Sequence, residues 1–72
     1  MKIIFTNHAR ERMQERGILE SEVIECIRSA DKILKKDAMN ISRFQKLFSC
    51  STLEVVGKHK GAYLIVITVY PL

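Results

Sequence analysis

The closing segment AYLIVITVY, residues 62–70, constrains the fold of this chain more than any other stretch of the sequence. Successive side chains of an extended strand point to opposite faces of a sheet. Both alternating sets are apolar here, and Thr68 and Tyr70 are the polar exceptions near the carboxyl end. Such a strand is typical of the middle of a sheet that is covered on both sides. We therefore predict a central, covered strand over residues 63–70, with one face formed by Leu64, Val66, Thr68 and Tyr70.

Strand patterns also occur earlier in the second half of the chain, where apolar runs are separated by short polar links. The expected strands are residues 32–36, 41–48, 53–57 and 63–70. Links of a few residues join antiparallel strands, because a parallel connection needs a longer crossover. The pattern therefore predicts a four-stranded antiparallel meander.

The stretch HARERMQER, residues 8–16, has helical periodicity instead. Ala9 and Met13 recur with the four-residue spacing of one helix face, whereas Arg10 and Gln14 fall on the opposite side. We expect the first pair to be buried and the second pair to face solvent.

Two further features complete the predicted helical part. Thr6 or Asn7 can cap the start of the first helix, and Gly17 is the residue expected just past its end. Residues 20–30 form a second amphipathic helix after a short turn, so the two helices should be neighbours. We therefore predict an α+β fold in which an N-terminal helical hairpin packs on the meander.

The length of 72 residues indicates a single domain, residues 1–72, with one small core. A core of this size stabilises a chain by only a few kcal/mol, so small domains often depend on a metal, a disulfide or a partner chain. A homodimer is one such solution. Cys26 and Cys50 have neither the paired spacing of zinc ligands nor the density of a disulfide scaffold. We expect two reduced thiols, no metal and no cofactor.

Hydropathy and charge indicate the surroundings of the chain. The apolar run at residues 3–5 is far shorter than a signal-peptide core, and no stretch reaches membrane-spanning length. We predict a cytoplasmic protein without a membrane partner. Residues 1–30 are neutral, whereas residues 31–72 hold seven Lys and Arg against three Asp and Glu. Excess positive charge attracts polyanions, so RNA is the expected partner.

A possible phosphate site lies on the first helix, where His8, Arg12 and Arg16 recur every four residues and form one ridge. We call these three residues the His-Arg ridge. It offers one group that exchanges protons near neutral pH and two permanent cations that bind phosphate oxygens. Metal-independent RNA cleavage needs these groups: a general base, a general acid and cations that stabilise the charge on phosphorus.

Strand residues could extend this site. Arg43 could continue the positive surface along the sheet, and Tyr70 could act as a proton relay beside Thr68. The alternative is structural: Arg12 pairs with Glu15 across one helical turn, Arg16 pairs with Glu20, and His8 is a surface residue at the helix start.

Two signatures, FTNHARERMQERGI at the start and VITVYP at the end, resemble the small prokaryotic family of unknown function numbered 4258. The resemblance spans essentially the whole chain and follows the pattern HAxxRMxxRGI followed by VITVYP. Helices followed by an antiparallel sheet in that family are similar to the RelE/ParE-type toxins and to barnase-like and colicin-like ribonucleases. The resemblance implies RNA cleavage without a metal and an antitoxin protein as a partner.

These considerations lead to two hypotheses. The first is a small toxin-type RNA-binding domain that acts as a metal-independent endoribonuclease of RelE-like architecture. Its catalytic candidates are His8, Thr68 and Tyr70, and its phosphate-binding candidates are Arg12, Arg16 and Arg43. The second is a non-catalytic protein-interaction or dimerisation module in which the His-Arg ridge is structural. The sequence leaves the choice between them open.

Overall fold

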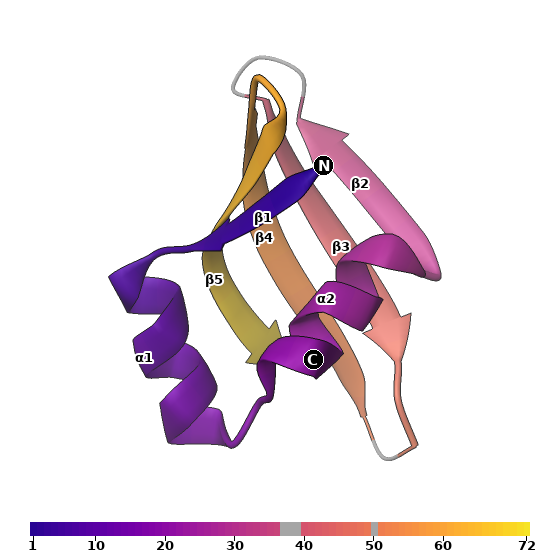
Figure 1. Cartoon of the computed structure of the whole chain (residues 1–72). Coiled ribbons are helices and arrows are strands. Elements are labelled where there is room, and N and C mark those ends of the chain that lie inside the picture. Colours follow the sequence, from indigo (N-terminus) through magenta and orange to yellow (C-terminus); the bar gives the residue numbers. More distant parts are fainter. Residues whose placement is uncertain (37–39, 50) are drawn as a thin grey trace.

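A five-stranded mixed sheet with two helices on one of its faces forms the fold in the computed structural model, which describes residues 1–36, 40–49 and 51–72 (Figure 1). The strand order is β1-β5-β4-β3-β2. In chain order the elements are β1 (Lys2–Phe5), α1 (Asn7–Arg16), α2 (Glu20–Arg28), β2 (Lys32–Lys36), β3 (Ile41–Leu47), β4 (Thr52–Lys60) and β5 (Tyr63–Pro71).

The predicted four-stranded antiparallel meander is wrong, because a fifth strand precedes the helices. Strands β2 to β5 pair antiparallel in chain order, but β1 pairs parallel with β5, from Lys2 opposite Tyr63 to Phe5 opposite Val66. The connection from β1 to β5 contains both helices and strands β2 to β4, so it is long enough for the crossover that a parallel pair requires. Four residues at the chain start carry little periodic signal, and only their pairing with β5 makes them a strand.

Strand β5 lies between β1 and β4, so its predicted central position is confirmed. Its predicted cover on both faces is wrong. Both helices contribute to one core cluster with the inward residues of β3, β4 and β5. The side chains of β5 that point the other way, such as Ile65 and Tyr70, are only half-buried. We call the sheet side opposite the helices the open face.

A β-bulge in β5 decides which of its side chains reach the open face. Val56 of β4 pairs with Thr68, but the next residue, Gly57, pairs with Val66, so Ile67 is an extra residue. The bulge reverses the alternation: Val66 and Val69 are both fully buried. The predicted face of Leu64, Val66, Thr68 and Tyr70 is therefore wrong, because Thr68 and Tyr70 turn to the open face. A bulge re-aims side chains in this way.

Helix α1 matches its prediction. Thr6 caps its start and accepts a hydrogen bond from the Ala9 amide, and Gly17 ends it in the left-handed conformation. Ala9 and Met13 are buried, and the predicted exposure of Arg10 and Gln14 is confirmed. Helix α2 ends at Arg28, two residues earlier than predicted.

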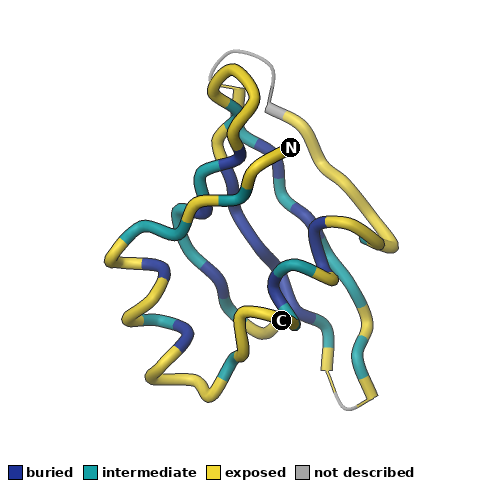
Figure 2. The backbone as a smooth tube through the Cα atoms, viewed as in Figure 1, coloured by how far each residue is buried: buried dark blue, intermediate teal, exposed yellow. Residues whose placement is uncertain are grey.

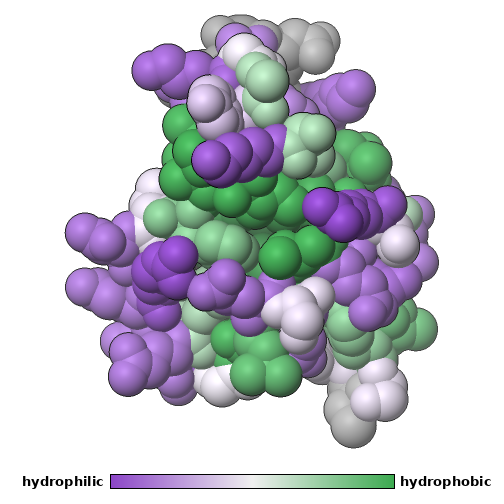
Figure 3. All heavy atoms as spheres, viewed as in Figure 1, coloured by the Kyte–Doolittle hydropathy of each residue, from purple (hydrophilic) through white to green (hydrophobic). Residues whose placement is uncertain are grey.

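Burial follows the two-layer arrangement. In Figure 2 the buried residues concentrate in the inner strands and on the inward sides of the helices, whereas residues 32–35 of the edge strand β2 are exposed. Figure 3 shows the helix side, where hydrophilic residues gather over α1 and hydrophobic residues gather between β1 and α2. Within the described ranges, no helix is long and apolar enough to cross a membrane.

Cys26 belongs to the core. It is a free, fully buried cysteine whose thiol donates to the Phe44 carbonyl at 3.4 Å. Burial raises the pKa of this thiol from 9.0 to about 11. The prediction for the second cysteine falls on Cys50, which lies outside the described residues.

Candidate functional site

Four polar side chains meet on the open face, and we call them the Glu54 cluster. They come from three adjacent strands: Arg43 and Gln45 from β3, Glu54 from β4 and Tyr70 from β5. The register brings them together, because Glu54 pairs directly with Gln45 on one side and with Tyr70 on the other. The cluster depends on the β-bulge, since a regular β5 would direct Tyr70 toward the helices.

The Glu54 carboxylate is the centre of the cluster. Its Oε1 accepts a hydrogen bond from Gln45 Nε2 at 2.6 Å. Its Oε2 accepts from Arg43 Nη1 at 2.8 Å and from the Tyr70 hydroxyl. Arg43 Nη1 also donates to the Tyr70 hydroxyl oxygen at 2.7 Å. Glu54 is only 4% exposed. The three protein donors therefore take the place of the hydrogen bonds to water that the carboxylate loses on burial.

Arg43 connects the cluster to solvent. About a third of its side chain is exposed, whereas the Glu54 side chain is almost fully covered. A guanidinium carries five N–H donors, and the cluster uses only those on Nη1. The donors on Nε and Nη2 are therefore suited to an anion that approaches the open face.

Charge is divided between the two layers. Residues 7–31, which form the helices and their links, hold six of the eight acidic residues and have a net charge of −2, whereas the rest of the chain has +6. Within the described strands, Glu54 is the acidic residue of the open face. The strand register and the alternation of side chains place five cations there: Lys2, Lys32, Arg43, Lys58 and Lys60.

The two arginines of the His-Arg ridge are engaged in structural contacts. Arg16 Nη1 donates to the Val69 carbonyl of β5 at 2.8 Å, which ties the end of α1 to the sheet. Arg12 pairs with Glu15, which confirms that part of the structural alternative. The predicted pairing of Arg16 with Glu20 is wrong, because Arg10 pairs with Glu20 at 2.8 Å.

His8 lies exposed on the first turn of α1. Arg10 points toward the start of α2. His8 and Arg12 are each two residues from Arg10, so they lie on nearly the opposite side of the helix. Both therefore lie on the flank of α1 that turns away from α2. Thr68 is half-buried on the open face, two residues before Tyr70.

Of the predicted site residues, Arg43 and Tyr70 are joined by a direct hydrogen bond. Glu54 was missed. A single carboxylate within the apolar strand sequence TLEVV was the available signal, since a buried charge requires partners. Among the residues that the structure describes, no three His, Cys, Asp or Glu side chains converge into a group that could hold a metal ion.

One protein family, described as a domain of unknown function (DUF4258), matches the chain over residues 5–71. No curated protein and no solved structure matches it. The matched region runs from the last residue of β1 to the last residue of β5, so it includes both helices, the His-Arg ridge and the Glu54 cluster. The chain therefore belongs to the DUF4258 family.

Proposed function

We propose that this protein is a small toxin-type RNA-binding domain that cleaves RNA without a metal, with the Glu54 cluster as its reactive centre. One observation carries the proposal: a buried carboxylate contacts an arginine and a tyrosine at the middle of a cationic sheet face. The surrounding lysines attract the RNA backbone. The cluster supplies proton-transfer groups and a fixed positive charge at one point of that surface.

The chemistry is a transesterification within the RNA strand. The 2′-oxygen forms a bond to phosphorus while the bond from phosphorus to the 5′-oxygen breaks, which leaves a 2′,3′-cyclic phosphate and a 5′-hydroxyl. The Glu54 carboxylate takes the proton of the 2′-hydroxyl through Tyr70, which accepts that proton while it passes its own proton to Glu54. Tyr70 gives its proton to the departing 5′-oxygen and recovers one from Glu54, so both groups return to their starting states. Arg43 stabilises the negative charge that develops on the phosphate oxygens.

The His-Arg ridge has a secondary place in this proposal. Arg12 and Arg16 keep guanidinium donors beyond those in their structural contacts, and these add positive charge on α1, on the other side of the sheet from the Glu54 cluster. His8 is the second candidate for proton transfer because its imidazole is exposed on the first turn of α1. Thr68 is a candidate to orient the RNA beside Tyr70.

The test is incubation of the purified protein with labelled single-stranded RNA in the presence of a metal chelator. Tyr70→Phe keeps the ring and removes the hydroxyl, so cleavage should fall at least a hundredfold while binding persists. His8→Ala measures the competing assignment in the same assay. Arg43→Ala should weaken binding and reduce the salt dependence of affinity by roughly 0.7 in the slope of log affinity against log salt.

Arg28→Ala is the matched control, because it removes one exposed cation from the last turn of α2 on the helix layer. It should leave cleavage and the salt slope unchanged. Binding without cleavage in the wild-type protein would contradict the catalytic part of the proposal. A binding affinity that does not respond to Arg43→Ala would contradict the assignment of the RNA surface.

A non-catalytic interaction module is the second candidate function. The observation that favours it is the use of Arg12 and Arg16 in structural contacts, which removes part of the reason to assign the ridge to RNA. Under the first proposal, the toxin-type domain, the expected protein partner is an antitoxin. Absence of both RNA binding and cleavage in the test above would leave the interaction module as the better proposal.

A further inference from the structure

An exposed tyrosine lies between two lysines on the open face, at the start of β5. Tyr63 is 44% exposed, and its pairing partners are Lys2 of β1 on one side and Lys60 of β4 on the other. The next residue of β5, Leu64, is fully buried in the core, so Tyr63 and both lysines point to the open face. Neighbouring strands are about 4.8 Å apart. The aromatic ring therefore has a cationic side chain beside it on each side.

Further cations lead from this tyrosine toward the Glu54 cluster. Lys60 and Lys58 are exposed and lie on the same face of β4, roughly 7 Å apart along the strand. Arg43 continues the line on β3, where it is paired with Val56 of β4. The spacing is comparable to that of neighbouring phosphates in an extended single strand of nucleic acid. These side chains form a line of positive charge across the open face.

The tyrosine and the Glu54 cluster lie toward opposite ends of the sheet. Strand β5 runs from the turn after β4 across the sheet (Figure 1). Tyr63 is paired with Lys60 at its start, and Tyr70 is paired with Glu54 near its end. Six residues of β4 separate these two positions, which corresponds to about 20 Å. One nucleotide cannot contact both places, whereas an oligonucleotide can.

An aromatic ring beside cations suits the base of a single strand. Proteins that bind single-stranded nucleic acid combine a positively charged track for the backbone with aromatic side chains on which bases stack. In a double helix the faces of the bases are covered by their neighbours, so this mode of binding selects unpaired RNA. Tyr63 supplies the ring, and the lysines beside it supply the positive charge.

We propose that Tyr63 is a stacking platform for one base of single-stranded RNA, and that Lys2 and Lys60 hold the phosphates beside that base. The strand then follows Lys58 to Arg43 and the cleavage centre. This inference rests on the RNA-binding function proposed above, and it adds a second contact about 20 Å from the Glu54 cluster. It also defines the substrate as an unpaired oligonucleotide.

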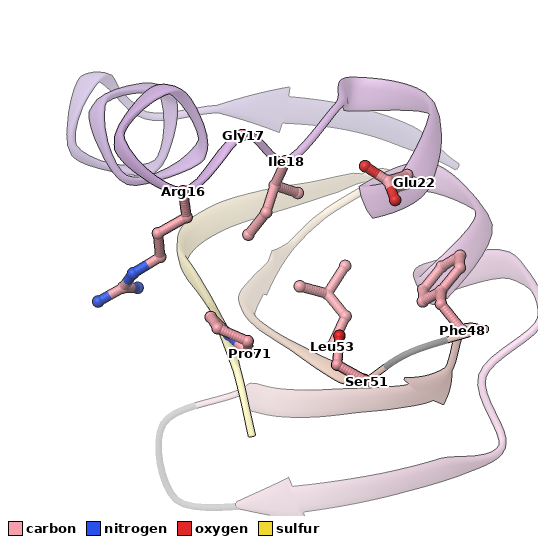
Figure 4. Close-up of a pocket in the computed structure, with 8 residues that line it drawn as sticks. All are labelled: Arg16, Gly17, Ile18, Glu22, Phe48, Ser51, Leu53 and Pro71. Atoms are coloured by element: carbon pink, nitrogen blue, oxygen red, sulfur yellow. The ribbon is translucent and has the colours of Figure 1, made fainter.

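The pocket in Figure 4 provides a control position away from this path. Its volume is about 220 Å³, and its apolar lining consists of Ile18, Phe48, Leu53 and Pro71. Leu53 belongs to the core between the sheet and the helices, so the pocket is separate from the open face. Leu19, the sequence neighbour of Ile18, is 63% exposed. Leu19→Ala is therefore the matched control for the loss of an exposed apolar side chain.

Tyrosine fluorescence tests the stacking directly. The chain has two tyrosines and no tryptophan, so Tyr63 is the only emitter in a Tyr70→Phe variant. That variant also keeps the RNA intact during the measurement. Single-stranded oligouridine of about eight nucleotides should quench the Tyr63 emission. The same strand annealed to oligoadenylate should quench it much less, because its bases are paired.

Affinity for labelled oligouridine, measured by fluorescence anisotropy in the same background, tests the contribution of each side chain. Tyr63→Ala should weaken binding roughly tenfold, whereas Tyr63→Phe, which keeps the ring, should bind as the parent does. Lys60→Ala should lower the salt slope by roughly 0.7. Lys35→Ala is its matched control, because Lys35 is exposed and pairs with the buried Ser42 on the other face of the sheet. Leu19→Ala should leave the affinity unchanged.

The outcomes separate this inference from the function on which it rests. Circular dichroism establishes that each variant is folded. RNA binding that neither quenches Tyr63 nor responds to Tyr63→Ala would overturn the stacking site and leave the proposed RNA function standing. A duplex that quenches Tyr63 as strongly as the single strand does would also overturn the stacking site. Absence of any RNA binding would overturn both proposals.

Discussion

Removal of the Arg16 side chain tests whether the His-Arg ridge is needed for folding. In the native structure Arg16 donates to the Val69 carbonyl, and that hydrogen bond joins the last turn of α1 to β5. Arg12 lies one turn earlier and pairs with Glu15 of the same helix. Arg16→Ala should therefore reduce the free energy of unfolding, whereas Arg12→Ala should change it little.

The magnitudes follow from the two environments. A hydrogen bond that involves a charged group contributes roughly 1.5–3 kcal/mol. Arg16 is exposed at the surface, where water can replace its donor after substitution, so we expect a loss of about 1–2 kcal/mol. A surface ion pair one helical turn apart contributes about 0.2–0.5 kcal/mol, and the high helix propensity of alanine offsets part of that loss.

Urea unfolding followed by circular dichroism, at one matched protein concentration, measures the loss in free energy of unfolding for both variants. The transition midpoint should shift without a change in slope, and the melting temperature of Arg16→Ala should fall by roughly 5–10 °C for a domain of this size. Added salt should screen the Arg12 effect more than the Arg16 effect, because Arg16 contacts a neutral carbonyl. Equal losses for the two variants, or no loss for Arg16→Ala, would refute the assignment of a structural tie to Arg16.

Two further predictions concern the core and the bulge. The pKa of Cys26 is about 11 in the folded protein and 9.0 without burial, so its contribution to the free energy of unfolding is present below pH 9 and should be lost as the pH rises toward 11. In a Cys50→Ser background, a thiol reagent at pH 8 should modify Cys26 only after denaturation. Rapid modification of the native protein would contradict the burial of Cys26. Gly57→Ala would place a Cβ 2.9 Å from Leu64 Cδ1 in the core. This substitution should lower the free energy of unfolding, measured with urea, by about 1–3 kcal/mol. An unchanged midpoint of the urea transition would show that Leu64 moves freely.

Much of the local structure could be predicted from the sequence. Strand β2 begins and ends as the alternation indicates, and Thr6 and Gly17 are the caps of α1. These features depend on residues that are close together in the sequence, so local residue preferences are enough to predict them. The short strand β1 could not be found in this way, because its hydrogen-bond partners in β5 lie about sixty residues away.

In the candidate site, too, the residue types could be read from the sequence, whereas their contacts depend on residues far apart in the chain. The residue types of Arg43 and Tyr70 pointed to phosphate chemistry, but nothing local indicated that they touch. Their contact requires three strands in register and a bulge that reverses the alternation of β5. A carboxylate in the apolar strand TLEVV indicates that partners are needed, but the sequence does not show which residues of the neighbouring strands supply them.

The residues that cap α1, the helical and strand periodicities and the positive charge of the second half follow from the sequence alone. Which strand completes the sheet, which face stays uncovered and which polar residues meet on it depend on the folded chain. Local conformational preferences extend over a few residues, whereas strand pairing and the burial of a carboxylate depend on groups far apart in the chain. The function proposed for this protein lies in that second category, because Tyr70 can reach Glu54 only where the bulge turns it to the open face.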